Sequence, residues 1–254
     1  MGDAKPGSGR APGLMASVLT ITGRDVGSMY RTPTGWVITA LYVALTAMVF
    51  TLSTLAPGEP ATLRYFFSPA AWLLLAICPA ISMRFFSEEI RSGTLEAMAV
   101  SPVSDLAIVL GKYLGGVAFL MLVLAPTLAF AACLWALGEP RPDIGAIAAG
   151  YLGLALAGAA YLAIGSVVSA LTDSQTLSFL ATLIVLLGAM LMTGLVVAQV
   201  STELGQKLAS LSMAARVNTF ARGVIDTGHI VYFLAIVAIG LAASVAVIQA
   251  RRWA

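Results

Sequence analysis

Six long stretches without a single charged residue constrain the fold of this chain more strongly than any other feature. They span residues 32–58, 65–83, 113–138, 144–172, 174–202 and 227–250, and all 14 basic and 12 acidic side chains lie between or outside them. A helix that crosses a hydrocarbon layer about 30 Å thick needs about 20 apolar residues. We therefore predict six transmembrane helices at about 36–56, 66–86, 110–137, 147–171, 177–200 and 229–249.

The composition points to the same class of protein. Hydrophobic residues make up 59% of the chain and charged residues 10%, whereas soluble domains contain roughly 25% charged residues. Apolar residues fill every face of the six stretches without the alternation of a lipid-facing strand, which argues against a β-barrel. We predict an all-α, polytopic membrane protein whose transmembrane domain covers residues 34–250.

The region before this domain has two parts. Residues 1–14 are rich in Gly, Pro, Ala and Ser, which predicts a flexible tail. Residues 15–33 are expected to form an amphipathic helix at the membrane interface. Its apolar side chains lie near one helical face, namely Met15, Val18, Leu19, Val26, Met29 and Tyr30. Gly23 and Gly27 leave a partly ordered leader as the alternative.

The distribution of basic residues predicts the orientation. The first apolar stretch is too long and too far along the chain for a cleaved secretory signal. With an even number of spans, nine of the 14 basic residues lie on the side of the two termini and five on the other side. The positive-inside rule then places the N-terminus and residues 251–254 in the cytoplasm.

Several functions find no support in the residues. Cys78 and Cys133 lie inside apolar stretches, and the chain has one histidine, so we expect no disulfide, metal site or cofactor. The net charge of +2 is small and its basic residues are dispersed, which gives no indication of nucleic-acid binding. A phosphate-binding loop around Gly111-Lys112 would need Gly at 106 and Ser or Thr at 113, where Leu and Tyr stand. We expect a chain without catalytic residues, driven by another polypeptide.

Small residues within the stretches predict close helix packing. Gly111 and Gly115 have the four-residue spacing of a helix-packing motif, and Gly158 and Gly165 lie in a stretch rich in Gly and Ala. The helix that contains Gly111 is longer than the bilayer is thick. We expect its first turns, including Lys112, to project into the cytoplasm.

The connection between the second and third predicted spans is unusually apolar for a solvated loop. It reads Ser-Glu-Glu-Ile-Arg-Ser-Gly-Thr-Leu-Glu-Ala-Met-Ala-Val-Ser-Pro-Val-Ser-Asp over residues 87–105. Glu88 and Glu89 suit the N-terminus of a helix, and Gly93 can bend the chain before a second short helix. A compact helix under the membrane with an exposed apolar side needs a partner.

This connection resembles the signature of the ABC-2 family of transporter permeases, in particular its gliding-motility and nitrous-oxide-accessory branch. The matching residues are the acidic pair Glu88-Glu89, then Arg91, the run Ser92-Gly93-Thr94-Leu95-Glu96, and Pro102-Val103-Ser104. The amphipathic N-terminal segment is similar to the connecting helix of that family, and residues 220–226 are similar to its outer loop.

The resemblance implies a membrane subunit that pairs with a second copy or a close relative and docks two ATPase subunits. Residues 88–102 would form the cytoplasmic coupling helix, and the turn at Asp173 would add a smaller contact. The implied coupling residues are Glu88, Glu89, Arg91, Ser92, Gly93, Thr94, Leu95, Glu96, Pro102 and Asp173.

The function expected from this resemblance is ATP-driven export across the plasma membrane of a bacterium. The transported substrate does not follow from the sequence, because the apolar walls are interchangeable. Two alternatives to an exporter stay open. The first is a structural or assembly subunit of an ATPase-driven surface machine, through which nothing passes. The second is a self-contained channel that conducts without an ATPase.

Overall fold

The computed structural model describes residues 13–54, 61–93, 104–139, 141–199 and 212–252, with residues 192–199 and 252 described by their backbone alone. These residues contain helices and no strand, which confirms the all-α class. The helices are α1 (Leu14–Arg31), α2 (Pro33–Ser53), α3 (Arg64–Ser82), α4 (Ser87–Ser92), α6 (Asp105–Leu124), the 3-10 turn η1 (Ala125–Thr127), α7 (Leu128–Leu137), α8 (Ile144–Leu171), α9 (Gln175–Gln199), α11 (Met213–Ala221) and α12 (Thr227–Arg252).

Among the described residues, five helical segments are long and apolar enough to cross a membrane. They cover residues 33–53, 64–92, 105–137, 144–171 and 227–251. The part of α9 with described side chains, Gln175–Leu191, is apolar but shorter than a span. Five of the six predicted spans therefore have a counterpart of sufficient length. The remaining one, predicted at about 177–200, stays a prediction.

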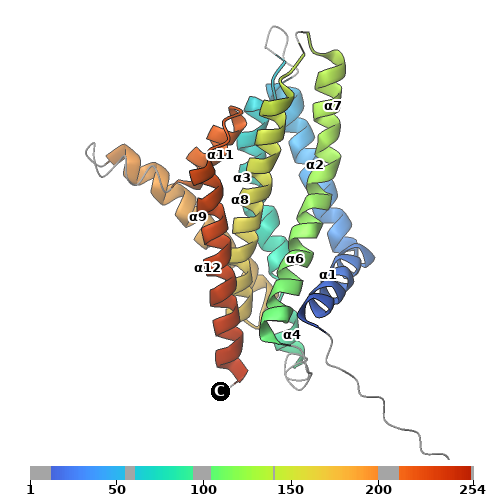
Figure 1. Ribbon diagram of the computed structural model, residues 1–254, viewed down its shortest axis with the longest axis vertical. Helices are drawn as coiled ribbons and strands as arrows, with labels where there is room; N and C mark the ends of the chain where they lie inside the picture. The colour runs from blue at the N-terminus through green and yellow to red at the C-terminus, as the bar shows by residue number, and fades with distance from the viewer. Residues whose placement is uncertain (1–12, 55–60, 94–103, 140, 200–211, 253–254) are drawn as a thin grey trace, which may run out of the picture.

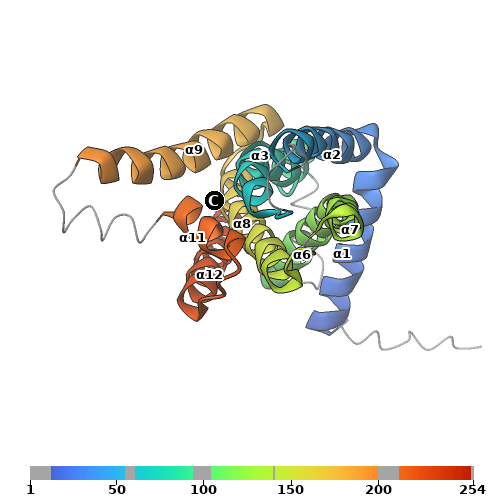
Figure 2. The same cartoon turned by 90° about the horizontal axis from the view of Figure 1, so that it is seen from above.

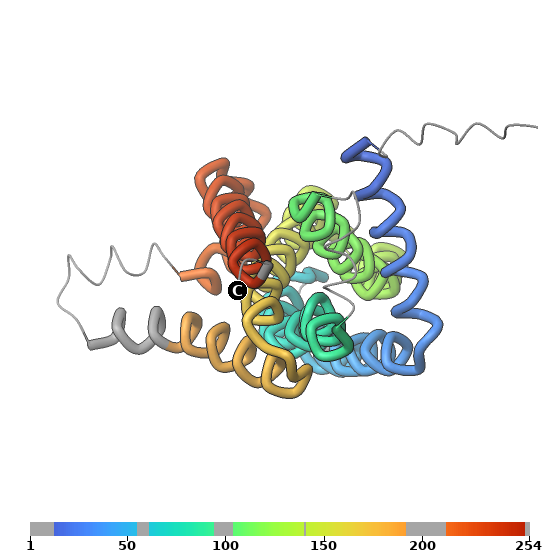
Figure 3. The backbone as a smooth tube through the Cα atoms, turned by 90° about the horizontal axis from the view of Figure 1, so that it is seen from below, coloured from blue at the N-terminus to red at the C-terminus, as the bar shows by residue number. Residues whose placement is uncertain are grey.

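The long helices run side by side along the long axis of the molecule (Figure 1). α8 occupies the centre and contacts α3, α6, α9, α11 and α12. Views from above and below show α9 leaning away from the other helices (Figure 2, Figure 3). The central position of α8 follows from its sequence, because its many small residues let neighbouring backbones approach closely.

Glycines of α8 and α12 mark the closest approaches. Gly158 faces the Leu120 side chain of α6, and Gly165 faces Ser82 of α3. A Cβ atom at Gly240 of α12 would lie 3.0 Å from both the Cβ and the carbonyl oxygen of Ala163. At Gly240 part of the facing surface is helix backbone, which cannot move aside as a flexible side-chain end such as that of Leu120 can.

α1 differs from the other long helices in direction. It crosses the lower end of the bundle, beside α6, while the chain turns at Thr32 and Pro33 into α2 (Figure 1, Figure 2). Val18 is buried, whereas Met15 and Leu19 are exposed and apolar. The helix thus packs one face on the bundle and keeps a second apolar strip uncovered.

We predict that Gly165→Ala destabilises the fold. Its Cβ would lie 2.7 Å from the Cβ of Ser82, which the backbone of α3 holds in place, and such overpacking costs about 1–3 kcal/mol. Gly188→Ala on α9 is the matched control, because nothing lies within 4 Å of a Cβ there. Thermal unfolding in detergent should show a lower midpoint for Gly165→Ala alone, and equal midpoints for the two variants would contradict the packing.

Candidate functional site: the surface at the α4 end of the bundle

The short helix α4 lies at the end of the bundle where α1 crosses α6 (Figure 1). Glu88 and Glu89 occupy its first turn and Arg91 its last, which is the arrangement that the helix dipole favours. Gly93 ends it with φ of 70° and donates its backbone N–H to the carbonyl oxygen of Ile90 at 3.2 Å. Glycine adopts this left-handed conformation without the steric cost of a Cβ.

Only part of the predicted coupling segment is visible. Glu88, Glu89, Arg91, Ser92 and Gly93 belong to α4 or its cap. The other predicted residues of the segment, Thr94, Leu95, Glu96 and Pro102, lie outside the described residues. The site can therefore be described from its first helix and from what surrounds that helix.

Ser169 of α8 holds the start of α4 in place. Its Oγ accepts hydrogen bonds from the backbone N–H of Phe86 at 3.0 Å and of Ser87 at 3.3 Å, and lies 3.0 Å from the Ser87 Oγ. The Ser87 Oγ donates in turn to the carbonyl oxygen of Met83 at 2.8 Å. Phe86, Ser87 and Ser169 are all buried, so the Ser169 hydroxyl satisfies two of the free N–H groups at the start of α4 and joins α4 to the central helix.

An ion-pair cluster joins the other side of α4 to α6 and α1. The Nζ of Lys112 lies 2.8 Å from Oε1 of Glu89 and 3.6 Å from Oδ2 of Asp25. Arg24 lies at the edge of the cluster, 3.5 Å from Asp25 and 3.9 Å from Glu89. Exposed fractions of the side chains are 5% for Lys112, 15% for Glu89 and 16% for Asp25, so the central pair is largely shielded from water.

The side chain of Lys112 is buried under α1 and α4, where two carboxylates meet it. The expectation that the first turns of its helix project into the cytoplasm stays a prediction. The Asp25–Lys112–Glu89 cluster was missed at the sequence level. A signal for it existed: Asp25 is the single acidic residue of α1, and Lys112 lies between two glycines suited to close packing.

The two glycines form the floor on which α1 rests. A Cβ at Gly111 would lie 2.7 Å from the Cβ of Ile21, and one at Gly115 would lie 3.2 Å from the Cβ of Asp25. The Oγ1 of Thr22 donates to the carbonyl oxygen of Gly111 at 3.0 Å. Backbone contact therefore docks α1 on α6 and brings Asp25 next to Lys112.

A polar cavity of about 300 Å³ opens between α1 and α4. Arg84 lies at its wall, with Nη1 donating to the Oγ1 of Thr32 at 3.3 Å and Nε 3.9 Å from the carboxylate of Glu88. The charged side chains around the cavity are Arg24, Asp25, Arg84, Glu88, Glu89 and Lys112. Three cations and three anions line it, so the charges of the lining sum to zero.

Asp173 lies at the same end of the molecule as α4. It belongs to the three-residue turn between α8 and α9, and α4 contacts both of these helices. The Ser174 Oγ accepts the backbone N–H of Leu177 at 3.4 Å and so caps α9. The fold thus brings the two predicted contact regions, α4 and the Asp173 turn, to one surface.

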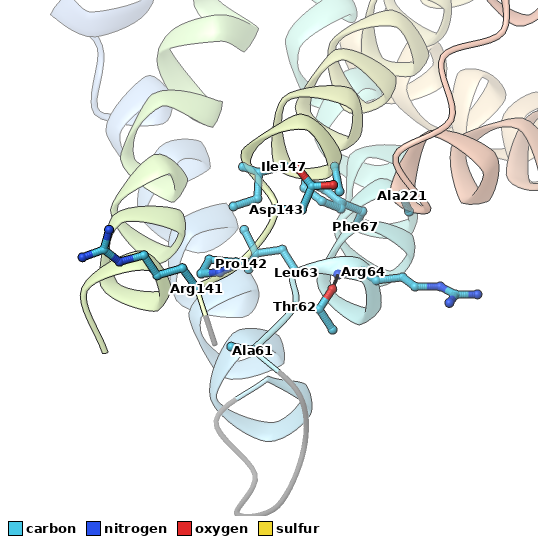
Figure 4. Close-up of a pocket in the computed structure, with 11 residues that line it drawn as sticks. Ala61, Thr62, Leu63, Arg64, Phe67, Arg141, Pro142, Asp143, Ile147 and Ala221 are labelled. Carbon is cyan, nitrogen blue, oxygen red and sulfur yellow. Dashed lines mark hydrogen bonds between the residues drawn. The ribbon is translucent and has the colours of Figure 1, made fainter. Parts of the chain in front are cut away.

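The opposite end of the bundle has a second cavity, of about 210 Å³ (Figure 4). Arg64 and Arg141 lie at its rim with their guanidinium groups directed away from its centre (Figure 4), and that of Arg141 lies 4.9 Å from the centre of the Trp135 ring. The Asp143 Oδ1 accepts the N–H of Gly145 at 2.8 Å and caps α8. These polar groups serve the fold, and the cavity wall itself is mainly apolar.

A bundle with five helical segments long and apolar enough to cross a membrane, among the residues that the structure describes, is typical of a polytopic membrane protein. A family model described as ABC-2 family transporter protein matches residues 42–215, which is 174 of the 254 residues. The chain therefore belongs to the ABC-2 transporter family. A search of curated proteins gave no match. Membership makes the chain a permease subunit of an ABC transporter, and it implies an ATPase subunit as partner.

We predict that Ser169→Ala loosens α4. The substitution leaves the buried N–H groups of Phe86 and Ser87 without their acceptor, at a cost of about 1–3 kcal/mol. Thr20→Ala is the control, because its exposed hydroxyl bonds within α1. Amide hydrogen exchange should accelerate over residues 86–92 in Ser169→Ala and not in Thr20→Ala; unchanged exchange in both would show that the serine pair does not hold α4.

Proposed function

We propose that this chain is the membrane subunit of an ATP-driven exporter, with no nucleotide site or catalytic residue of its own. An ATPase subunit docks on α4, on the segment that follows it to Pro102, and on the turn at Asp173. The observation that supports this most directly is α4 itself: a short charged helix, anchored at the inner end of the bundle in a member of the ABC-2 family.

The exposed side chains of α4 supply the contact chemistry. The Glu88 side chain is 58% exposed, and Arg91, Ser92 and Asp173 are exposed as well. The buried side of α4 is fixed by Ser169 and Lys112. A partner that pushes on the exposed side therefore acts on a helix that is already anchored, which is what transmission of force requires.

The proposed setting is the plasma membrane of a bacterium, with both termini in the cytoplasm. The charge count favours this orientation. α1 then lies at the cytoplasmic interface with Met15 and Leu19 toward lipid, which agrees with its direction across the bundle. This orientation requires that α9 also crosses the membrane, as the fifth of six spans along the chain.

We further propose a second permease copy, identical or closely related, as partner. α2 buries 22% and α12 buries 17% of their most apolar 18 residues within the chain, which leaves wide apolar faces for lipid and for a second copy. The motif at Glu88–Glu96 supports placement in the gliding-motility and nitrous-oxide-accessory branch.

Charge reversal on the exposed side of α4 should weaken ATPase docking. We expect Glu88→Lys and Arg91→Glu together to insert into the membrane normally but to lower the amount of ATPase subunit that co-purifies from native membranes at least tenfold. Arg222→Glu, at the far end of the bundle, is the control and should keep wild-type recovery. Equal recovery from all variants would count against α4 as the docking helix.

Cysteine labelling tests the orientation and, at the same time, whether α9 crosses the membrane. In a background with Cys78→Ala and Cys133→Ala, an impermeant maleimide should label Arg222→Cys in intact cells and Asp173→Cys only after the cells are opened. The two positions lie on opposite sides only if α9 crosses the membrane. Labelling of both from one side would contradict the six-span topology.

A further inference from the structure

The ion-pair cluster has a geometry that ordinary surface salt bridges lack. Its central cation, Lys112, comes from an early turn of a membrane helix, and its two carboxylates come from elements far away in the chain, Asp25 on α1 and Glu89 on α4. The ammonium also lies 5.8 Å from the centre of the Phe86 ring, directly before α4. Three separate elements thus meet at one buried charge.

The three elements are not attached to one another equally. α1 has a second attachment to α6, through the glycine floor and the hydrogen bond from Thr22 to Gly111. α4 has its second attachment to α8, through Ser169. Lys112 joins α4 to α6 and, through Asp25, to α1, and the more exposed Arg24 adds a longer contact of 3.9 Å from α1 to Glu89.

We propose that Lys112 is a positioning residue that ties the coupling helix α4 to α1 and α6, so that an ATPase displacing α4 moves all three elements together. The proposal rests on the function proposed above and names the route by which it operates. The charges of Lys112, Arg24, Asp25 and Glu89 sum to zero, so each buried charge of the cluster has an opposite charge beside it. Removing one partner leaves an uncompensated buried charge, which separates the elements.

If Lys112 only stabilised the fold, the expected results would differ from those of a positioning residue. A variant in which the cluster is uncharged distinguishes the two roles. Lys112→Met alone strands two carboxylates and should lower the thermal midpoint. The triple variant Lys112→Met, Glu89→Gln, Asp25→Asn leaves no buried charge without a partner, because the remaining Arg24 side chain is 58% exposed. It should recover most of that loss, since neutral replacements of buried ion pairs are often tolerated. The ion pairs that join α4 to α6 and α1 stay broken in the triple variant. Lys112→Arg keeps a cation in place and should preserve these ion pairs.

The first measurement is amide hydrogen exchange of the full chain alone, in nanodiscs. We expect residues 87–92 to exchange at least fivefold faster in the triple variant than in the wild type or Lys112→Arg. Residues 14–31 should exchange equally in all three, because the glycine floor still holds α1. Equal exchange of α4 in the wild type and the triple variant overturns the proposal, whether or not an ATPase binds.

The second measurement uses the complex with its co-purified ATPase, trapped with ATP and vanadate. In the wild type, trapping should change exchange in α4, α1 and the first turns of α6; in the triple variant, it should change exchange in α4 alone. A response of α1 in the triple variant overturns the role of Lys112. Absence of an ATPase from the wild-type complex overturns the proposed function instead, and it does so independently of the first measurement.

Discussion

The hydrocarbon layer decides most of this structure, because it offers no hydrogen-bond partner to a peptide group. Helices satisfy their own backbone, and the remaining polar groups must find one another. Side chains accordingly bond to neighbouring backbones: the Tyr113 hydroxyl donates to the Ala159 carbonyl at 3.0 Å, and the Tyr151 hydroxyl donates to that of Thr127 at 2.7 Å. A direct Ser166–Ser244 contact of 2.8 Å joins α8 to α12. With lipid as apolar as the core, such contacts and small residues specify the packing.

The two ends of the bundle use the charges of the described residues differently. At the end with the Arg141 cavity, Arg141 and Asp143 hold local structure, one over an aromatic ring and the other at a helix start. At the α4 end, Asp25, Glu89 and Lys112 join elements that are distant in the chain. This difference is the reason that we propose transmission of motion at the α4 end.

The sequence predicted the helices well, because few folds besides a membrane-spanning helix leave 20 or more consecutive residues without a charge. It predicted that Gly111 and Gly115 favour close packing, but spacing cannot say which helix packs there, and the structure identifies α1. It placed the first turns of the Lys112 helix in the cytoplasm but did not predict that the lysine side chain is buried against carboxylates from 87 and 23 positions away (residues 25 and 89). Pairing across such separations is a property of tertiary structure, so Asp25 and the glycines beside Lys112 were only a signal and could not say which charges pair.

The left-handed glycine Gly93 ends α4 after six residues, which limits the surface that α4 can offer to a partner. A helix of six residues rises about 9 Å, and Gly93 ends it. A stable protein interface covers roughly 800 Å² on each partner, which is more than two helical turns present. An ATPase that docks on α4, as we propose, would therefore need further contacts, and the Asp173 turn is an exposed candidate among the described residues. In that proposed mode several elements at the α4 end share the binding, so a partner must match all of them to bind tightly.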